Sequence, residues 1–287
     1  MNKILEKKQL SSDVWEMKIE APMIAEARKA GQFLIIQIDS EWGERIPLTI
    51  ADADAKAGTV TMVFQTVGAT THYLAELKAG GAIANVLGPL GNPTHVEKFG
   101  RVVCVGGGIG AAPLYPIVQA MKAAGNHITA IIGARSKELI IFEDRIRAAA
   151  DVTIIVTDDG SYGRKALVTE PLKEICASAK PDMTVAIGPP IMMKFCSLTV
   201  KEFNAPIMVS LNTIMIDGTG MCGGCRVLID GQTKFVCVDG PEFDGSKVDF
   251  DNMTSRMRSF KDMEDEDHHK CHLNLGLAPL KQNGSVK

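Results

Sequence analysis

The stretch Arg101–Leu114 reads Arg-Val-Val-Cys-Val-Gly-Gly-Gly-Ile-Gly-Ala-Ala-Pro-Leu, and it decides the fold of the central part of the chain. Residues 101–105 form an apolar run that is typical of a buried parallel strand. A glycine-rich turn and a helical segment follow directly, and this order favours nucleotide binding, because glycine lets the backbone approach phosphates and a helix N-terminus favours their charge. Gly106, Gly108 and Ala111 fit the spacing G-x-G-x-x-G with alanine in the last place. The predicted nucleotide-binding residues of this loop are Gly106, Gly107, Gly108, Ile109 and Gly110.

Strand and helix signals go on alternating as far as residue 211. Strands are expected at 128–134, 152–157, 184–187 and 206–211, with helical segments near 142–147, 169–177 and from 191. Five parallel strands joined by helices form a doubly wound sheet, which binds ligands at the carboxyl ends of its strands. The turns Asp158–Ser161 and Gly188–Pro190 lie at such ends. Each is also ordinary turn chemistry, so only their convergence with the glycine loop favours a ligand. The predicted contacts are Asp158, Asp159, Gly160, Gly188 and Pro189.

The first hundred residues have a different pattern. Val14–Ile19 alternates apolar and polar residues, and the segments 32–38 and 59–67 are further strand candidates. Short strands without long helices between them predict an antiparallel barrel, with Gly88–Gly91 as a closing turn.

Two segments of this barrel carry candidate binding chemistry. In Arg45-Ile-Pro-Leu-Thr49 an arginine fork suits a pyrophosphate, and the threonine hydroxyl suits a flavin ring atom. Gly68–Leu74 opens a helix with small and hydroxyl residues, which favours an anion through free N–H groups. A surface ion pair and a plain N-cap are the alternative interpretations of these two segments. The predicted residues are Arg45, Pro47, Leu48, Thr49, Gly68, Thr70 and Thr71.

The segment Asp217–Cys237 holds three of the seven cysteines, at positions 222, 225 and 237. Plant-type [2Fe–2S] proteins use the spacing C-x4-C-x2-C…C, which places Asp217 where the first ligand stands. The predicted cluster ligands are Asp217, Cys222, Cys225 and Cys237. A zinc site with the same four ligands, a redox dithiol, and buried cysteines in a glycine-rich turn remain as alternatives.

Composition limits the remaining possibilities. A net charge of −3 and a pI near 6.1 argue against nucleic acid as a partner. No apolar run approaches the ~18 residues that a membrane span needs, and residues 1–9 lack the apolar core of a secretory signal, so the cytoplasm is expected. Of the four other cysteines, those at 104, 176 and 196 are expected in the core. Pro241–Gly245 is expected to be a turn. The polar stretch 251–287 is expected to be solvated or to contact a partner. Its tract at 268–272 resembles a metal-binding tract but offers too few ligands of fixed geometry to favour that alternative.

These segments together resemble the ferredoxin reductase-like electron-transfer subunits, over roughly residues 1–260. This family includes the subunits of dihydroorotate dehydrogenase B, sulfide dehydrogenase and NADH-dependent ferredoxin:NADP+ oxidoreductase. Arg45–Thr49 is similar to the family's flavin-binding segment, Gly106–Pro113 to its nucleotide loop, and Thr157–Gly163 to its second NAD-side segment. The expected fold is a β-barrel plus α/β architecture. The expected domains are a FAD-binding barrel at 1–100, a doubly wound NAD(P)-binding domain at 101–211, a [2Fe–2S] lobe at 212–250 and a polar tail at 251–287.

The resemblance also implies a function and partners. It implies FAD, a [2Fe–2S] cluster and NAD(H) as cofactors, and a hydride exchange followed by single-electron relay. The orotate-type subunits carry a fourth cysteine where this chain has Asp217, whereas the ferredoxin:NADP+ type carries an aspartate. The resemblance therefore favours a bifurcating heterodimer whose larger, glutamate-synthase-like subunit holds FAD and [4Fe–4S] clusters and serves ferredoxin. An orotate-type subunit, a stand-alone NADH-dependent flavin reductase and a zinc-stabilised nucleotide-binding module are the alternatives. The sequence does not decide between NADH and NADPH as the nucleotide, since Arg135 and Ser136 fit either a contact with a 2′-phosphate or an ordinary loop.

Overall fold

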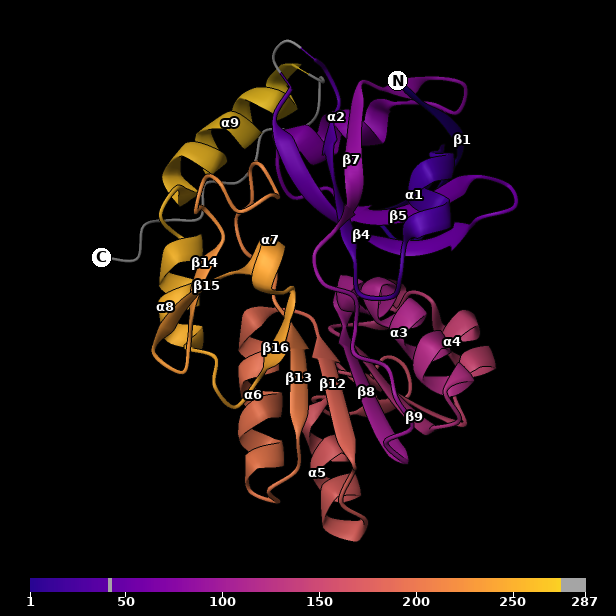
Figure 1. Cartoon of the computed structure of the whole chain (residues 1–287), viewed down its shortest axis with the longest axis vertical. Helices are drawn as coiled ribbons and strands as arrows, with labels where there is room; N and C mark the ends of the chain where they lie inside the picture. Colours follow the sequence, from indigo (N-terminus) through magenta and orange to yellow (C-terminus); the bar gives the residue numbers. More distant parts are fainter. Residues whose placement is uncertain (41–42, 275–287) are drawn as a thin grey trace.

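The computed structural model describes residues 1–40 and 43–274, and within 272–274 it describes the backbone alone. Figure 1 shows a barrel at the top, a parallel sheet with its helices below, and the segments after β13 along one side. The residues 275–287 of the expected polar tail lie outside the described residues.

The N-terminal sheet is antiparallel throughout, with strand order β6-β1-β2-β5-β4-β3-β7. Its edge strands β6 and β7 are separated in sequence by Ala84 alone, so the chain itself brings the two edges together and the sheet is nearly closed. Ile4, Met17, Leu34 and Phe64 belong to the apolar core of this barrel. The elements are β1 Asn2–Gln9, β2 Val14–Glu20, α1 Pro22–Ala27, β3 Phe33–Gln37, β4 Arg45–Asp54, β5 Thr59–Gln65, α2 Ala69–Glu76, β6 Ala82–Ile83 and β7 Asn85–Leu90.

The second sheet has the order β11-β10-β9-β8-β12-β13-β16, and its five central strands are parallel. The strands are β8 Arg101–Gly107, β9 His127–Ala134, β10 Val152–Thr157, β11 Arg164–Lys165, β12 Met183–Ile187, β13 Ile207–Ser210 and β16 Glu242–Asp244. The helical segments are η1 Gly108–Gly110, α3 Ala111–Ala123, η2 Lys137–Leu139, α4 Glu143–Ala149, α5 Thr169–Ser178 and α6 Pro190–Lys201.

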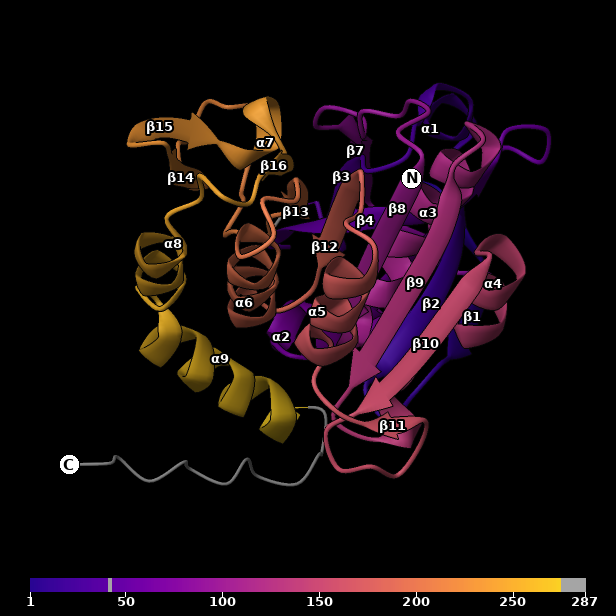
Figure 2. The ribbon, with the colours of Figure 1, turned by 90° about the horizontal axis from the view of Figure 1, so that it is seen from below.

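Helices cover both faces of this sheet, as a doubly wound fold requires. Alternate residues of β8 point to opposite faces: Cys104 packs in the core under α3 and α4, and Val105 packs in the core under α5 and α6. Figure 2 shows these two helix pairs on the two sides of the strands. The cysteines at 104, 176 and 196 are at most 3% exposed, so the prediction that they are core residues is confirmed.

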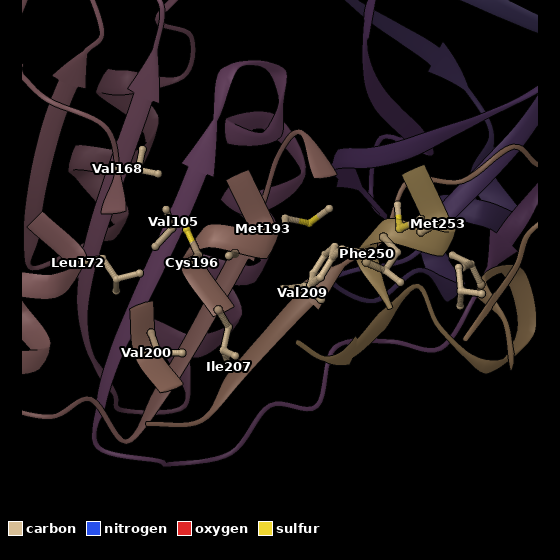
Figure 3. Close-up of a cluster of buried hydrophobic side chains, with 14 of the residues drawn as sticks. Val105, Val168, Leu172, Met193, Cys196, Val200, Ile207, Val209, Phe250 and Met253 are labelled. Carbon is tan, nitrogen blue, oxygen red and sulfur yellow. The ribbon is translucent and has the colours of Figure 1, made fainter. Parts of the chain in front are cut away.

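The segments after β13 extend the core that lies under α5 and α6. They are β14 Arg226–Ile229, β15 Gln232–Phe235, α7 Val236–Asp239 and α8 Phe250–Met257. The helix α9 Lys261–Asn274 follows, and none of its described side chains belongs to this core. Figure 3 shows this core running from Val105 and Leu172 through Met193 to Phe250 and Met253 of α8.

Two turn predictions were wrong. Gly88, Pro89 and Leu90 lie inside β7, and residues 242–244 form β16, which pairs antiparallel with β13. Within 251–287, the expected solvated segment, the described residues contain most of α8 and all of α9. No helix among the described residues combines the length and the apolar character that crossing a membrane would require.

Candidate functional site

A cavity of about 1190 Å³ lies between the barrel and the carboxyl ends of the parallel strands. It exceeds the usual ~300–1,000 Å³ of a small-molecule site, as a site for an extended dinucleotide would. Many of the predicted residues line it. They are Pro47, Leu48, Thr49, Thr71, Gly107, Gly108, Ile109, Gly110, Asp158, Gly188 and Pro189. The structure thus brings together segments of both sheets that lie far apart in the sequence.

The glycine loop between β8 and α3 packs tightly against the end of β12. Gly108 has a φ of +56°, which favours glycine, and Gly108–Gly110 forms a short 3-10 turn. A Cβ on Gly110 would lie 2.3 Å from the carbonyl oxygen of Ile187. The loop therefore leaves no room for a side chain at Gly110, where it meets the end of β12, and the Met192 side chain fills the space beside Gly107 and Gly188.

The turn after β10 is held by its own side chains. The Asp159 carboxylate accepts hydrogen bonds from the Ser161 hydroxyl at 2.7 Å and from the Ser161 N–H at 2.9 Å, and the hydroxyl bond is the larger cause of the lowered pKa of Asp159. Gly160 follows with a φ of +79°. Of the three residues predicted here, Asp158 alone lines the cavity among the described residues, and Arg135 at the end of β9 joins it there.

On the barrel side, the start of α2 shows local capping. The Thr71 hydroxyl accepts from the N–H of Val67 and of Gly68, each at 3.1 Å, and donates to the Gly68 carbonyl. Thr70 donates to the carboxylate of Glu44. The N-cap interpretation of Thr70 or Thr71 was wrong, because Gly68 is the N-cap and Thr71, at the third helical position, bonds back to it; Thr71 also lines the cavity.

Arg45 stands between the barrel and the cysteine segment. Its Nη2 donates to the backbone carbonyl of Asp217 at 3.5 Å, and its buried Nε has no hydrogen-bond partner among the described residues. A half-buried arginine with a buried, unsatisfied Nε–H fits an anionic group such as a pyrophosphate. The bond that Arg45 forms among the described residues goes to a backbone carbonyl, so the surface ion pair considered for it is not observed there.

The four predicted ligands fall into two pairs. Cys225 Sγ lies 3.3 Å from Cys237 Sγ, and Cys222 Sγ lies 3.5 Å from Asp217 Oδ1. A [2Fe–2S] cluster has two irons, each with two protein ligands, so two pairs of donors fit it better than the single tetrahedral centre of zinc. The Gly224 N–H also points at Cys222 Sγ, at 3.4 Å.

The two pairs differ in environment. Cys225 and Cys237 are 1% and 2% exposed, whereas Cys222 is exposed. Burial, and then the hydrogen bond with Cys225, raise the pKa of Cys237 to about 12, so a thiolate pair at this end needs a metal ion to form. Burial raises the pKa of Asp217, but backbone N–H groups, first that of Thr219, outweigh it, and the net pKa is lowered. Asp217 is thus held as a carboxylate.

The loop that carries the ligands packs on the barrel. A Cβ on Gly218 would lie 2.8 Å from side-chain atoms of both Ile35 and Leu90, and the φ of Gly218 is +74°. From the other side, Arg256 Nη2 of α8 donates to the Gly224 carbonyl at 3.4 Å. The cluster loop is therefore fixed between the barrel and α8.

Several cavity residues were not predicted. Thr213, whose Oγ1 is buried without a hydrogen-bond partner among the described residues, lines the cavity, as do Met257 and Glu264. Thr213 lies in the connection after β13, and the other two lie at the end of α8 and in α9. No periodicity or motif marks them, because their place depends on tertiary packing alone.

Comparisons with known proteins agree with this architecture. Residues 212–249 match the family described as the iron–sulfur cluster binding domain of dihydroorotate dehydrogenase B. The chain is 48% identical over 264 residues to a dihydroorotate dehydrogenase B (NAD(+)) electron transfer subunit homolog of Thermotoga maritima, covering 92% of this chain and 93% of that protein. It is 31% identical over 253 residues to the Bacillus pumilus electron transfer subunit, covering 85% of this chain and 96% of that one.

The solved structures point the same way. A chain of the NADH-dependent reduced ferredoxin-NADP oxidoreductase, studied for flavin-based electron bifurcation, superposes with a TM-score of 0.90 at 45% identity, covering 95% of this chain and 98% of that chain. A ferredoxin NADP+ reductase from Neisseria gonorrhoeae, solved with FAD and NADP, shares the fold with a TM-score of 0.58 at 20% identity, covering 71% of this chain and 90% of that chain.

The fold and the site define a ferredoxin reductase-like oxidoreductase with an iron–sulfur domain, the class expected from the sequence. Within that class, the chain belongs to the family of dihydroorotate dehydrogenase B electron transfer subunits. An electron-transfer role with FAD, NAD(H) and a [2Fe–2S] cluster agrees with this membership, and a subunit of this kind implies a larger partner.

Proposed function

We propose that the chain is the small subunit of a bifurcating NADH-dependent ferredoxin:NADP+ oxidoreductase. In this proposal it exchanges a hydride between NAD(H) and FAD and relays single electrons through a [2Fe–2S] cluster. The receiver is a larger, glutamate-synthase-like subunit that holds its own FAD and [4Fe–4S] clusters. The observation that carries the proposal is the ligand set: Asp217 is paired with Cys222 on a loop whose backbone N–H groups keep the aspartate ionised.

The chain's own residues divide the binding tasks. The glycine loop at 106–110, with Asp158, Asp159, Gly160, Gly188 and Pro189, would hold the nicotinamide nucleotide at the strand ends. Arg45, Pro47, Leu48, Thr49, Gly68, Thr70 and Thr71 would hold FAD, and Asp217, Cys222, Cys225 and Cys237 the cluster. FAD, when bound, converts a two-electron hydride transfer into single-electron steps that an iron–sulfur centre can carry.

Two features position these groups. The apolar cavity wall at Pro47 and Leu48 would exclude water from the ring system, while Gly108, where an added Cβ would meet nothing within 4 Å, would leave its backbone open to phosphates. Arg45 would pair with the flavin pyrophosphate through Nε while its Nη2 holds the backbone of Asp217. The same side chain would thus hold the flavin site and the cluster loop at a fixed position relative to each other.

A second candidate is the electron transfer subunit of a dihydroorotate dehydrogenase B. The match of residues 212–249 to that enzyme's iron–sulfur domain and the names of the relatives favour it. In this candidate the partner would be a dihydroorotate-oxidising barrel, and Asp217 would be a ligand variation within that family.

Anaerobic native purification with identification of the co-purifying subunit by mass spectrometry separates the two. A large flavin- and [4Fe–4S]-containing, glutamate-synthase-like subunit is the expected result. A dihydroorotate-oxidising partner would overturn the first proposal in favour of the second. A chain that purifies alone and turns over NADH with free acceptors would overturn both in favour of a stand-alone reductase.

A further inference from the structure

The C-terminal arm, which we define as residues 250–274 with α8 and α9, is attached firmly at its first helix. Phe250 and Met253 are 6% and 1% exposed and belong to the core under α5 and α6. Asp249 caps α8 by accepting from the Asn252 N–H at 2.9 Å, and Asp251 pairs with Lys194 of α6 at 2.6 Å. The position of α8 is therefore fixed by the body of the protein.

The second helix of the arm crosses the barrel helix α2. Figure 1 shows α9 extending from α8 towards the region of α2 at the top of the barrel. The rings of His72 and His268 lie with their centroids 4.8 Å apart. Cys271 is 2% exposed, and its Sγ lies 3.7 Å from the carbonyl oxygen of Ala69, the first residue of α2. The helix thus packs on the N-terminal half of α2.

These contacts come from one narrow face of α9. Glu264, His268 and Cys271 are spaced by four and then three residues, so they share a side of the helix. Glu264 lines the large cavity together with Thr49 and Thr71, and Met257 at the end of α8 lines it too.

The solvent side of α9 has a different character. Lys270 pairs with Glu266 at 2.8 Å on the side opposite His268, and Lys261 pairs with Asp265 at 3.1 Å at the exposed start of the helix, each pair four residues apart. Such pairs support an exposed helix but contribute little to holding it on the protein. The attachment of α9 to the barrel therefore rests on its inner face.

We propose that the C-terminal arm forms a wall of the flavin site and retains FAD in the cavity. The inference rests on the proposed FAD site. A cofactor held by Pro47–Thr49 and the start of α2 has α9 against that same helix, so its exit requires α9 to move away. A helix attached by few side chains opens locally without unfolding of the core, which makes the opening of α9 the step that limits FAD loss.

Two truncations of the holoprotein test this. One ends after Ser259 and removes α9, and the other ends after Asn274 and keeps it as the matched control. The rate of FAD release is measured as the rise in flavin fluorescence after the holoprotein is diluted. We expect release from the shorter chain to be about tenfold faster than from the full chain, a factor equivalent to ~1.4 kcal/mol, and release from the control to be unchanged. Equal release rates in all three chains would overturn the inference.

A point variant covers the case in which the shorter chain does not fold. Cys271→Arg places a long cation at a position that is 2% exposed and displaces α9, while Lys270→Ala on the solvent side is its control. We expect faster FAD release in Cys271→Arg alone, with the unfolding temperature of the apoprotein close to that of the control. Unchanged release would refute the role of the arm, and a full chain that binds no FAD at all would refute the proposed site as well.

Discussion

The buried carboxyl of Glu242 should make the free energy of unfolding depend on pH, by an amount that follows from its environment. This residue begins β16, where the antiparallel strand meets the connection between the two sheets. Its Oε1 accepts from the Thr94 hydroxyl at 2.6 Å, and its buried Oε2 has no hydrogen-bond partner among the described residues. Burial raises the pKa of Glu242 from 4.5 to about 7, against the smaller opposing effect of the Thr94 bond.

The sign follows from the proton count. Well below pH 4.5 the carboxyl is protonated in both the folded and the unfolded chain, so its burial does not change the free energy of unfolding with pH. Between pH 4.5 and about 7 the unfolded chain releases a proton that the folded chain keeps, so stability falls as the pH rises. The two pKa values differ by about 2.5, and at about 1.36 kcal/mol for each pH unit the loss is ~3 kcal/mol above pH 7.

The variant Glu242→Gln stays neutral at every pH and keeps the acceptor for Thr94. We expect it to unfold at the same temperature as the wild type near pH 4.5 and at a temperature on the order of 5–10 °C higher at pH 8. Differential scanning fluorimetry from pH 4.5 to 8 measures both. Glu20→Gln, an exposed change on β2, is the control and should match the wild type. A gap between wild type and Glu242→Gln that is the same at both ends of the range would refute the reasoning.

Three further predictions concern the binding sites. Gly110→Ala places a methyl group 2.3 Å from the Ile187 carbonyl oxygen. We therefore expect the KM for NADH to rise about tenfold or more. An unchanged KM would contradict the close approach of the two turns. Asp217→Cys should keep the cluster and shift its midpoint potential by on the order of tens of millivolts, because a thiolate replaces a carboxylate ligand. An unchanged potential in redox-titrated EPR would count against Asp217 as a ligand. Glu138 engages the Ser136 hydroxyl at 2.6 Å beside the strand end that carries Arg135, so Glu138→Lys should raise kcat/KM for NADPH relative to NADH several-fold, and an unchanged ratio would remove this loop from cofactor selection.

The parallel sheet could be predicted because its signals are local. Residues 101–107 carry an apolar run that ends in glycines, and the helix starts at once, so sequence and structure agree here closely. β16 could not be predicted in the same way. Its residues 242–244 stand between Pro241 and Gly245, which are turn formers, and only the edge of β13 makes them a strand.

The helix α9 shows a second limit of local patterns. Its composition is almost wholly polar, which is typical of a solvated segment. Ion pairs four residues apart support the helix, and a contact face as narrow as Glu264, His268 and Cys271 leaves too weak a periodicity to be recognised.

The sequence predicted which segments line the cavity better than it predicted which side-chain groups in them are free to bind a ligand. Thr70 and Thr71 have the residue types of an anion site, but their hydroxyls bond to Glu44 and to the backbone at the start of α2. Thr213 and Glu264 line the cavity without any motif, because their position follows from how the C-terminal segments pack. The cysteine spacing, by contrast, predicts individual ligands, since covalent spacing limits which residues reach one cluster, and the structure places the four predicted ligands in two close pairs.

The proposed electron path requires one chain to hold both a flavin and a binuclear iron–sulfur cluster. Quantifying iron, acid-labile sulfide, zinc and flavin in the anaerobically purified protein tests it most directly. We expect about two iron and about two sulfide per chain together with about one FAD. A colourless protein with about one zinc per chain and neither iron nor flavin would contradict it.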